Sequence, residues 1–146
     1  MHIAFALFAD AANLSQEGKL NILGVFDALQ VGALPALHPR ATLVLRFKAG
    51  QADVGPHALR LEWQNPAGEA LWSTAGELSV GAMPPGAPEL DMPLIAMIDL
   101  PIDRVGEYQM RVAVDDTLLT SLALHVRTAE VGMGAMPAMG GGRLVS

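Results

Sequence analysis

Apolar and polar residues alternate along most of the chain, and no segment sustains the repeat of a helix. Leu59, Leu61 and Trp63, for example, alternate with charged or polar side chains. A period of two indicates a strand with one buried face. The pattern predicts eight strands, near residues 2–9, 19–28, 41–49, 57–65, 69–80, 89–99, 107–114 and 117–127. Strands at this spacing are typical of a β-sandwich or a small barrel.

Three of these segments are apolar at nearly every position: Ile3–Ala9, Leu20–Phe26 and Leu90–Leu100. Such strands lie centrally in a sheet, or they carry a second apolar face that packs against something else. Gly24 interrupts the second segment, which predicts a bulge or a close backbone approach there.

Turn residues predict two hairpins. Asn65–Gly68 has the residues preferred in a type I turn. We expect this turn to pair Trp63 with Ala70, which would make Trp63 and Trp72 diagonal neighbours on the core face. The second hairpin turns at residues 115–116, where two aspartates tolerate positive φ.

One short segment resembles the tyrosine corner of immunoglobulin-like sandwiches. Tyr108 starts a predicted strand two residues before Met110, which stands where those domains have a cysteine. The predicted fold is therefore an antiparallel Greek-key β-sandwich of the immunoglobulin-like type, with about eight strands. The resemblance carries no activity with it.

Composition narrows the class of protein. The 146 residues fit one domain, and an apolar fraction of 51% excludes disorder. A net charge of −6 disfavours binding to nucleic acid, and the lack of cysteine excludes disulfides and thiolate metal sites. Charged residues make up only 16%, against a usual ~25%. They are sparse in the three apolar segments, so we predict that those strands meet another subunit.

Location follows from what the apolar runs can do. No uncharged run approaches the ~18 residues of a membrane helix. Ile3–Ala9 mimics the apolar part of a signal peptide but lacks a basic segment before it, so a buried first strand is favoured over a secreted protein. We therefore expect a soluble, cytoplasmic protein.

The C-terminal residues have a different composition, which divides the chain into a domain at 1–127 and a Gly- and Met-rich tail at 128–146. A flexible tail is the favoured interpretation. Met133, Met136 and Met139 recur every three residues, so an extended tail could instead present three thioethers to a partner. Thioethers also suit copper(I), which is the third alternative.

The stretch FALFADAANLSQEGKLNILGVFDAL, residues 5–29, resembles an uncharacterised family of short bacterial β-sandwich proteins with an AD-A-N…GKLNILG-FD signature. Leu43–Phe47 and Gly106–Asp116 fit the same family, so the resemblance covers about residues 1–127. It implies a sandwich and a cytoplasmic location. It implies no reaction, and no catalytic residue can be carried over.

Four polar residues of that signature are candidates for binding: Asp10, Asn13, Asn21 and Asp27. The favoured interpretation is turn chemistry, in which Asp10 and Asn13 cap a loop and Gly18 supplies positive φ. In the alternative, Asn21 and Asp27 share a face and line a polar groove, unless a bulge at Gly24 separates them.

No catalytic motif is present, and the four histidines are scattered, so we predict neither an enzyme nor a cofactor. Acidic residues gather at predicted strand ends, where adjoining loops could hold calcium, although strand-end aspartates also serve turns. These weak metal candidates are Asp53, Asp99, Asp103, Asp115 and Asp116.

The predicted function is a non-enzymatic interaction module that self-associates or scaffolds another protein. We expect the apolar loops 31–38 and 80–88, here called the rims, to contribute to the contact surface of this module. The alternative is a ligand- or calcium-binding sandwich that uses the acidic strand ends.

Overall fold

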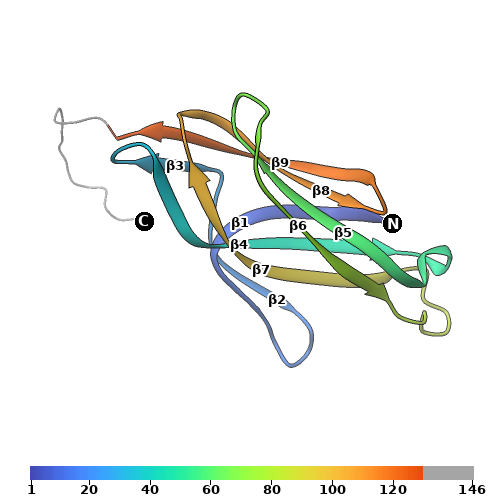
Figure 1. The fold of residues 1–146 in the computed structure, drawn as a ribbon. Coiled ribbons are helices and arrows are strands. Elements are labelled where there is room, and N and C mark those ends of the chain that lie inside the picture. The colour runs from blue at the N-terminus through green and yellow to red at the C-terminus, as the bar shows by residue number, and fades with distance from the viewer. Residues whose placement is uncertain (130–146) are drawn as a thin grey trace.

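A computed structural model describes residues 1–129, which form two packed β-sheets (Figure 1). One sheet has four strands in the order β2-β1-β4-β7, and the other has five in the order β3-β9-β8-β5-β6. The elements are β1 (His2–Leu14), β2 (Leu20–Phe26), β3 (Ala28–Val31), β4 (Ala36–Ala49), the 3-10 turn η1 (Gln51–Asp53), β5 (Gly55–Gln64), β6 (Ala70–Val80), β7 (Leu90–Ile102), β8 (Gly106–Val114) and β9 (Thr117–Thr128). The predicted immunoglobulin-like β-sandwich is confirmed. Of the predicted tail, 128–146, only Thr128 and Ala129 belong to the described residues.

All eight predicted strands are present, with three corrections. The strand predicted at 41–49 begins at Ala36 as β4, so the last residues of the predicted loop 31–38 belong to a strand. The segment predicted at 19–28 ends as β2 at Phe26, and the chain bends at Asp27 and crosses to the other sheet as β3. There the Asp27 carbonyl accepts the His125 N–H (2.9 Å), and β3 pairs with β9 in parallel, so the sandwich is not wholly antiparallel. The first strand runs five residues beyond its predicted end at Ala9, to Leu14.

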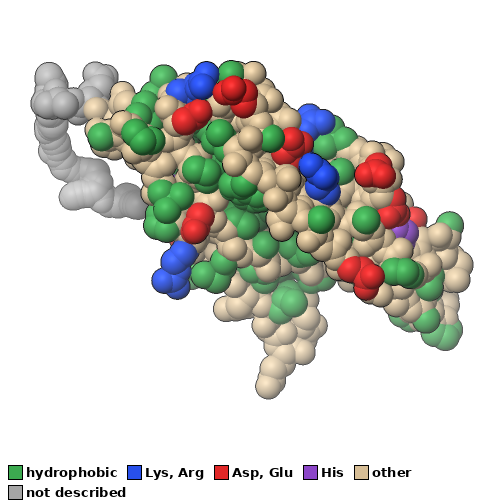
Figure 2. Space-filling view, viewed as in Figure 1, with side chains coloured by type: hydrophobic (Ala, Val, Ile, Leu, Met, Phe, Trp, Pro, Cys, Tyr) green, Lys and Arg blue, Asp and Glu red, His purple; other side chains and the backbone are tan. Residues whose placement is uncertain are grey.

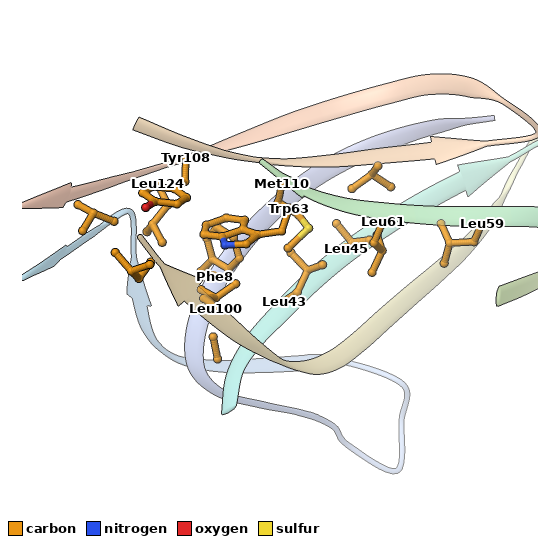
Figure 3. Packing of buried hydrophobic residues seen from close by; sticks show 14 of the residues in the cluster. Phe8, Leu43, Leu45, Leu59, Leu61, Trp63, Leu100, Tyr108, Met110 and Leu124 are labelled. Atoms are coloured by element: carbon orange, nitrogen blue, oxygen red, sulfur yellow. The ribbon is translucent and has the colours of Figure 1, made fainter. Parts of the chain in front are cut away.

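The core lies between the sheets and uses the alternating positions that the sequence indicates (Figure 3). Trp63 lies near its centre and has no exposed surface. Its ring stacks on Tyr108 with centroids 5.1 Å apart and meets Phe8 of the other sheet edge-on at 6.1 Å. Offset and edge-to-face aromatic contacts of this kind add to the gain from area burial alone.

The register of the β5–β6 hairpin differs from the predicted one. The type I turn is present, with the Gly68 N–H donating to the Asn65 carbonyl (2.9 Å). However, Asn65 itself pairs with Glu69. The register of the two strands shifts after Trp63, so Trp63 lies directly opposite Trp72. The predicted pairing of Trp63 with Ala70 is therefore wrong. Both rings still lie on the core side, as predicted.

The two indoles join the sheets. Trp63 Nε1 donates to the Pro101 carbonyl (3.0 Å) and Trp72 Nε1 donates to the Asp99 carbonyl (3.1 Å). Both acceptors belong to β7, which is an edge strand of the opposite sheet. Each indole N–H thus finds a partner, and β7 is tied across the sandwich by two side chains of neighbouring strands.

Both other predicted turn features are confirmed. Asp115 and Asp116 adopt φ of +50° and +66° in the two-residue β8–β9 turn. The buried Tyr108 hydroxyl accepts the N–H groups of Asp103 (2.9 Å) and Arg104 (3.0 Å) and donates to the Asp103 carboxylate (2.7 Å). Burial raises the pKa of Tyr108, and the hydroxyl hydrogen bond lowers the pKa of Asp103. This is the tyrosine corner expected from the sequence.

The β1–β2 hairpin extends past the body of the sandwich. β1 pairs with β4 only as far as Ala9, whereas its pairing with β2 continues to Leu14. Residues 10–24, here called the arm, therefore form a two-stranded ribbon that projects from the four-stranded sheet (Figures 1 and 2). At its base stands Gly24, with φ of +70°, where a Cβ would lie 2.3 Å from Asp10 Oδ2. The close approach predicted at Gly24 is present.

The variant Tyr108→Phe tests the corner. It leaves the N–H groups of Asp103 and Arg104 without their acceptor, so we expect the free energy of unfolding in urea to fall by about 1–3 kcal/mol. Met110→Leu conserves volume in the same strand and should lower it less. An unchanged value for Tyr108→Phe would show that the hydroxyl does not hold the corner.

The variant Gly24→Ala tests the base of the arm. Gly18, with φ of +82° and no atom within 4 Å of its Cβ position, is the matched control, because both alanines carry the same kind of backbone strain. We expect Gly24→Ala to lower the free energy of unfolding more than Gly18→Ala does. The excess should shrink when Asp10 is also changed to Ala. Equal losses at the two glycines would contradict a tight contact at the base.

Candidate interaction surface

The outer faces of the two sheets differ in chemistry. On the five-stranded sheet, the positions that alternate with core residues carry charge or hydrogen bonds, as in the contacts of Ser121 with Gln109 (2.6 Å) and of Arg111 with Glu62 (4.0 Å). The four-stranded sheet lacks such a polar covering. Its outer face is built from three rows of cross-strand neighbours on β1, β4 and β7: Phe5–Arg46–Pro93, Leu7–Val44–Ile95 and Ala9–Thr42–Met97.

Arg46 is the one charged side chain in those rows, and it is paired. Its guanidinium bonds to the Asp91 carboxylate, with Nε 2.8 Å from Oδ1, and lies 6.0 Å from the centre of the Phe5 ring. Lys48 Nζ is 3.7 Å from the same carboxylate. The hydrogen bond from Arg46 lowers the pKa of Asp91. The charges therefore satisfy one another at one end of the outer face and leave its middle apolar.

The arm lies over part of this face. Ala9 and Val44 have no exposed surface although neither belongs to the core cluster. A hollow of about 400 Å³ separates Leu20 and Ile22 of the arm from Phe5, Arg46 and Pro93. A second, of about 450 Å³, is lined by residues 10–12 of the arm and by Thr42, Ile95 and Met97.

Apolar side chains remain uncovered on and around the arm. Among residues 1–129, the three most exposed large hydrophobic side chains are Leu23 (71%), Met97 (62%) and Val25 (60%). Leu23 and Val25 belong to β2, and Met97 to the outer face. All three lie in segments that contain few charged residues and that we therefore predicted to contact another subunit. The structure thus brings segments far apart in the sequence into one sheet.

The four polar signature residues do not form one site. Asn13 and Asn21 face each other across the arm, where Asn21 Nδ2 donates to Asn13 Oδ1 (3.0 Å). Asp10 lies beside Gly24 and Asp27 lies at the crossing between sheets, so the shared groove of Asn21 and Asp27 is not present. The loop-capping role of Asp10 and Asn13 is also wrong, because both belong to β1. Gly18 has positive φ as predicted.

Other predicted contact residues are dispersed. Met133, Met136 and Met139 lie outside the described residues. In the rim at 31–38, Leu34 and Leu37 are 38% and 56% exposed, whereas Val80 in the rim at 80–88 is buried.

The five acidic candidates do not form one group. Asp53, Asp115 and Asp116 lie in η1 and the β8–β9 turn, whereas Asp99 and Asp103 lie near the end of β7. Asp99 accepts the Arg40 N–H (2.9 Å), and Asp103 accepts from Asn65 Nδ2 (2.8 Å) as well as from the tyrosine corner. Within residues 1–129, no group of three or more His, Asp or Glu side chains is placed to hold a metal ion.

Sequence reasoning missed one cluster, around His57. Its Nδ1 lies 2.5 Å from Asp115 Oδ2 and its Nε2 lies 2.5 Å from the Asp53 carbonyl. Both partners only accept, so the ring donates at both nitrogens and is an imidazolium. The Asp53 carboxylate accepts the Gly50 N–H (2.8 Å) and pairs with the Met1 amino group (3.0 Å). Because Asp115 is 58 residues away in sequence, no local pattern indicates this contact.

The cluster shifts three pKa values. The hydrogen bond to Asp115 raises the pKa of His57 and lowers the pKa of Asp115. The Gly50 N–H lowers the pKa of Asp53. With both ring nitrogens committed, His57 joins η1, β5 and the β8–β9 turn and has no free nitrogen for a proton transfer.

The pH dependence of stability tests this cluster. Because the pKa of His57 is above 6.5 in the folded protein, its contribution is complete below pH 6.5 and is lost as pH rises through the raised value. The pKa of Asp115 is below 3.8, so the contribution falls again as pH drops through that lowered value. Urea unfolding should therefore show the largest gap between wild type and His57→Gln from pH 3.8 to 6.5, narrowing in alkali. In an Asp115→Asn background the gap should lose most of its pH dependence. A gap that widens above neutral pH would contradict the imidazolium.

The chain resembles known proteins in two respects. An immunoglobulin-like protein from Pseudomonas aeruginosa is similar in structure, with a TM-score of 0.35 and 16% sequence identity over 86% of this chain and 95% of that one. No curated protein matches the sequence. Among residues 1–129, no helix has the length and hydropathy to cross a membrane. A family of unknown function, DUF6941, matches residues 4–127, so the predicted membership of an uncharacterised family is confirmed and the chain belongs to that family.

Proposed function

We propose that the protein is a non-enzymatic assembly module that associates with a second copy of itself through the arm and the adjoining outer face. The observation that carries the proposal is the concentration of exposed apolar side chains on this side, with Leu23 71% and Val25 60% exposed. The outer face of the five-stranded sheet instead carries paired charges and polar side chains. Contiguous exposed apolar surface on a soluble domain marks a contact site.

The arm itself supports the same proposal. A two-stranded hairpin is marginally stable in water unless something packs against it. Beyond Ala9, the β1 strand of the arm no longer pairs with β4. A second copy would give the arm the apolar contact that its own sheet supplies only in part. Each leucine or valine that becomes fully buried contributes about 1.5–3 kcal/mol, and a two-fold contact buries each one twice.

The polar clusters support a role without catalysis. His57 bonds to the Asp115 carboxylate and to the Asp53 carbonyl, and Asp115 also accepts the Ala58 N–H. Tyr108 and Asp103 close the tyrosine corner. A general base needs reach to a substrate proton, and each of these groups already has a structural partner. The fold is also built without a disulfide, which suits the reducing cytoplasm, where we place this assembly.

The experiment is the mass of the protein in solution by sedimentation equilibrium over a range of concentrations. We expect a dimer for wild type and at least about tenfold weaker association for Leu23→Lys, because a charge at the contact is desolvated. Leu118→Lys is the matched control, since Leu118 is 45% exposed on the other sheet, and it should associate like wild type. A wild-type protein that stays monomeric at its highest attainable concentration would contradict the proposal.

A further inference from the structure

The four sheet edges are not equally protected. Native proteins block exposed edges with charge, proline or short strands, because open N–H and C=O groups recruit other strands. The edge strand β7 carries Pro93 and Pro101 together with Asp91, β6 carries Glu77, and β3 has only four residues. The fourth edge, β2, reads LNILGVF and has neither a charge nor a proline.

The hydrogen-bonding groups at the free edge of β2 follow from the hairpin that closes the arm. The Ser15 N–H donates to the Lys19 carbonyl (2.9 Å), and the Gly18 N–H donates to the Ser15 carbonyl (2.9 Å). Bonded and non-bonded pairs alternate along an antiparallel ladder, so Asn21 and Leu23 point their backbone groups at β1. The backbone groups of Ile22 therefore point away from β1, along the open edge.

We propose that β2 pairs antiparallel with β2 of a second copy about a two-fold axis at Leu23, which joins two four-stranded sheets into one. This inference rests on the proposed self-association and specifies its geometry. Around that axis Leu23 lies opposite its own copy, Ile22 lies opposite Gly24 of the partner subunit, and Asn21 lies opposite Val25 of the partner subunit. Antiparallel neighbours must lie on the same side of the sheet, and a pairing centred on Leu23 places opposite each other residues that are an even number of positions apart.

Two features favour a second copy as the occupant. A two-fold contact sets each edge residue near its own copy, so a charged strand would repel itself, and β2 has no charge over Leu20–Phe26. The axis covers Leu23, whose exposed fraction of 71% is the largest among the large hydrophobic side chains of residues 1–129.

The test uses the lack of cysteine in the chain. The variant Leu23→Cys can form a disulfide only with another copy, and two residues opposite each other in a non-bonded antiparallel pair have Cα atoms about 4.5 Å apart, within disulfide range. After mild oxidation, non-reducing electrophoresis should show a covalent dimer as the main species. Leu118→Cys, exposed on the other sheet, is the matched control and should give at least about tenfold less dimer at equal concentration.

A second pair of variants tests the backbone itself. Ile22→Pro removes the N–H at the free edge without removing a bond to β1, whereas Ile22→Ala shortens the side chain and keeps that N–H. We expect the dimer dissociation constant to rise at least about tenfold more for the proline variant than for the alanine variant. Circular dichroism of both variants checks that the sandwich is folded.

The outcomes separate this inference from the proposed function. If wild type is a dimer that Leu23→Lys weakens, yet Leu23→Cys gives no covalent dimer and Ile22→Pro associates like Ile22→Ala, the edge pairing is wrong and the self-association through the arm stands. If wild type is a monomer at every concentration, both are wrong.

Discussion

The cross-sheet bonds from two tryptophans to β7 constrain much of this structure. β7 pairs with β4 alone, and the indoles of Trp63 and Trp72 hold it to the five-stranded sheet through the carbonyls of Pro101 and Asp99. The two tryptophans lie directly opposite each other in the β5–β6 pair, next to the register shift after Trp63. The tyrosine corner begins just past this anchored end of β7, so the same contacts position the start of β8. The same contacts thus contribute to the packing of the core, to the alignment of the two sheets and to the protection of the β7 edge.

Local patterns were enough to predict most of the fold. Alternation located eight strands because each buries one face, and turn residues located both hairpins. The failures have two causes, one a contact far away in the sequence and the other a side-chain contact within a turn. Asp27 starts a crossing between sheets because β9, almost 100 residues later, offers an edge to β3. The Trp63 register shifts because Asn65 accepts the N–H of Glu69 as well as pairing with it.

The candidate surface was predictable in outline and not in detail. Low charge in three separate segments indicated strands with two apolar faces, and the structure places all three in one sheet. The arm was not expected, because the residues Asp10 and Asn13 that suggest a loop instead continue β1. Polar residues that suit turns also suit an exposed ribbon, so composition alone does not distinguish the two. The contact of His57 with Asp115 depends on strand order, which spacing along the chain does not encode.

The edge strands β7 and β2 differ in how well they are protected against pairing with another strand. Both are edges of the same sheet, yet β7 is closed by prolines, by Asp91 and by the indoles of the opposite sheet, whereas β2 keeps its backbone groups and its leucine open. A sheet that needed only to avoid association would guard both edges, since one charged residue in β2 would suffice. Selective protection of one edge is what an assembly with a defined contact requires, because it removes the competing pairing and leaves one. The segments with the fewest charged residues are then the ones that a second copy would cover.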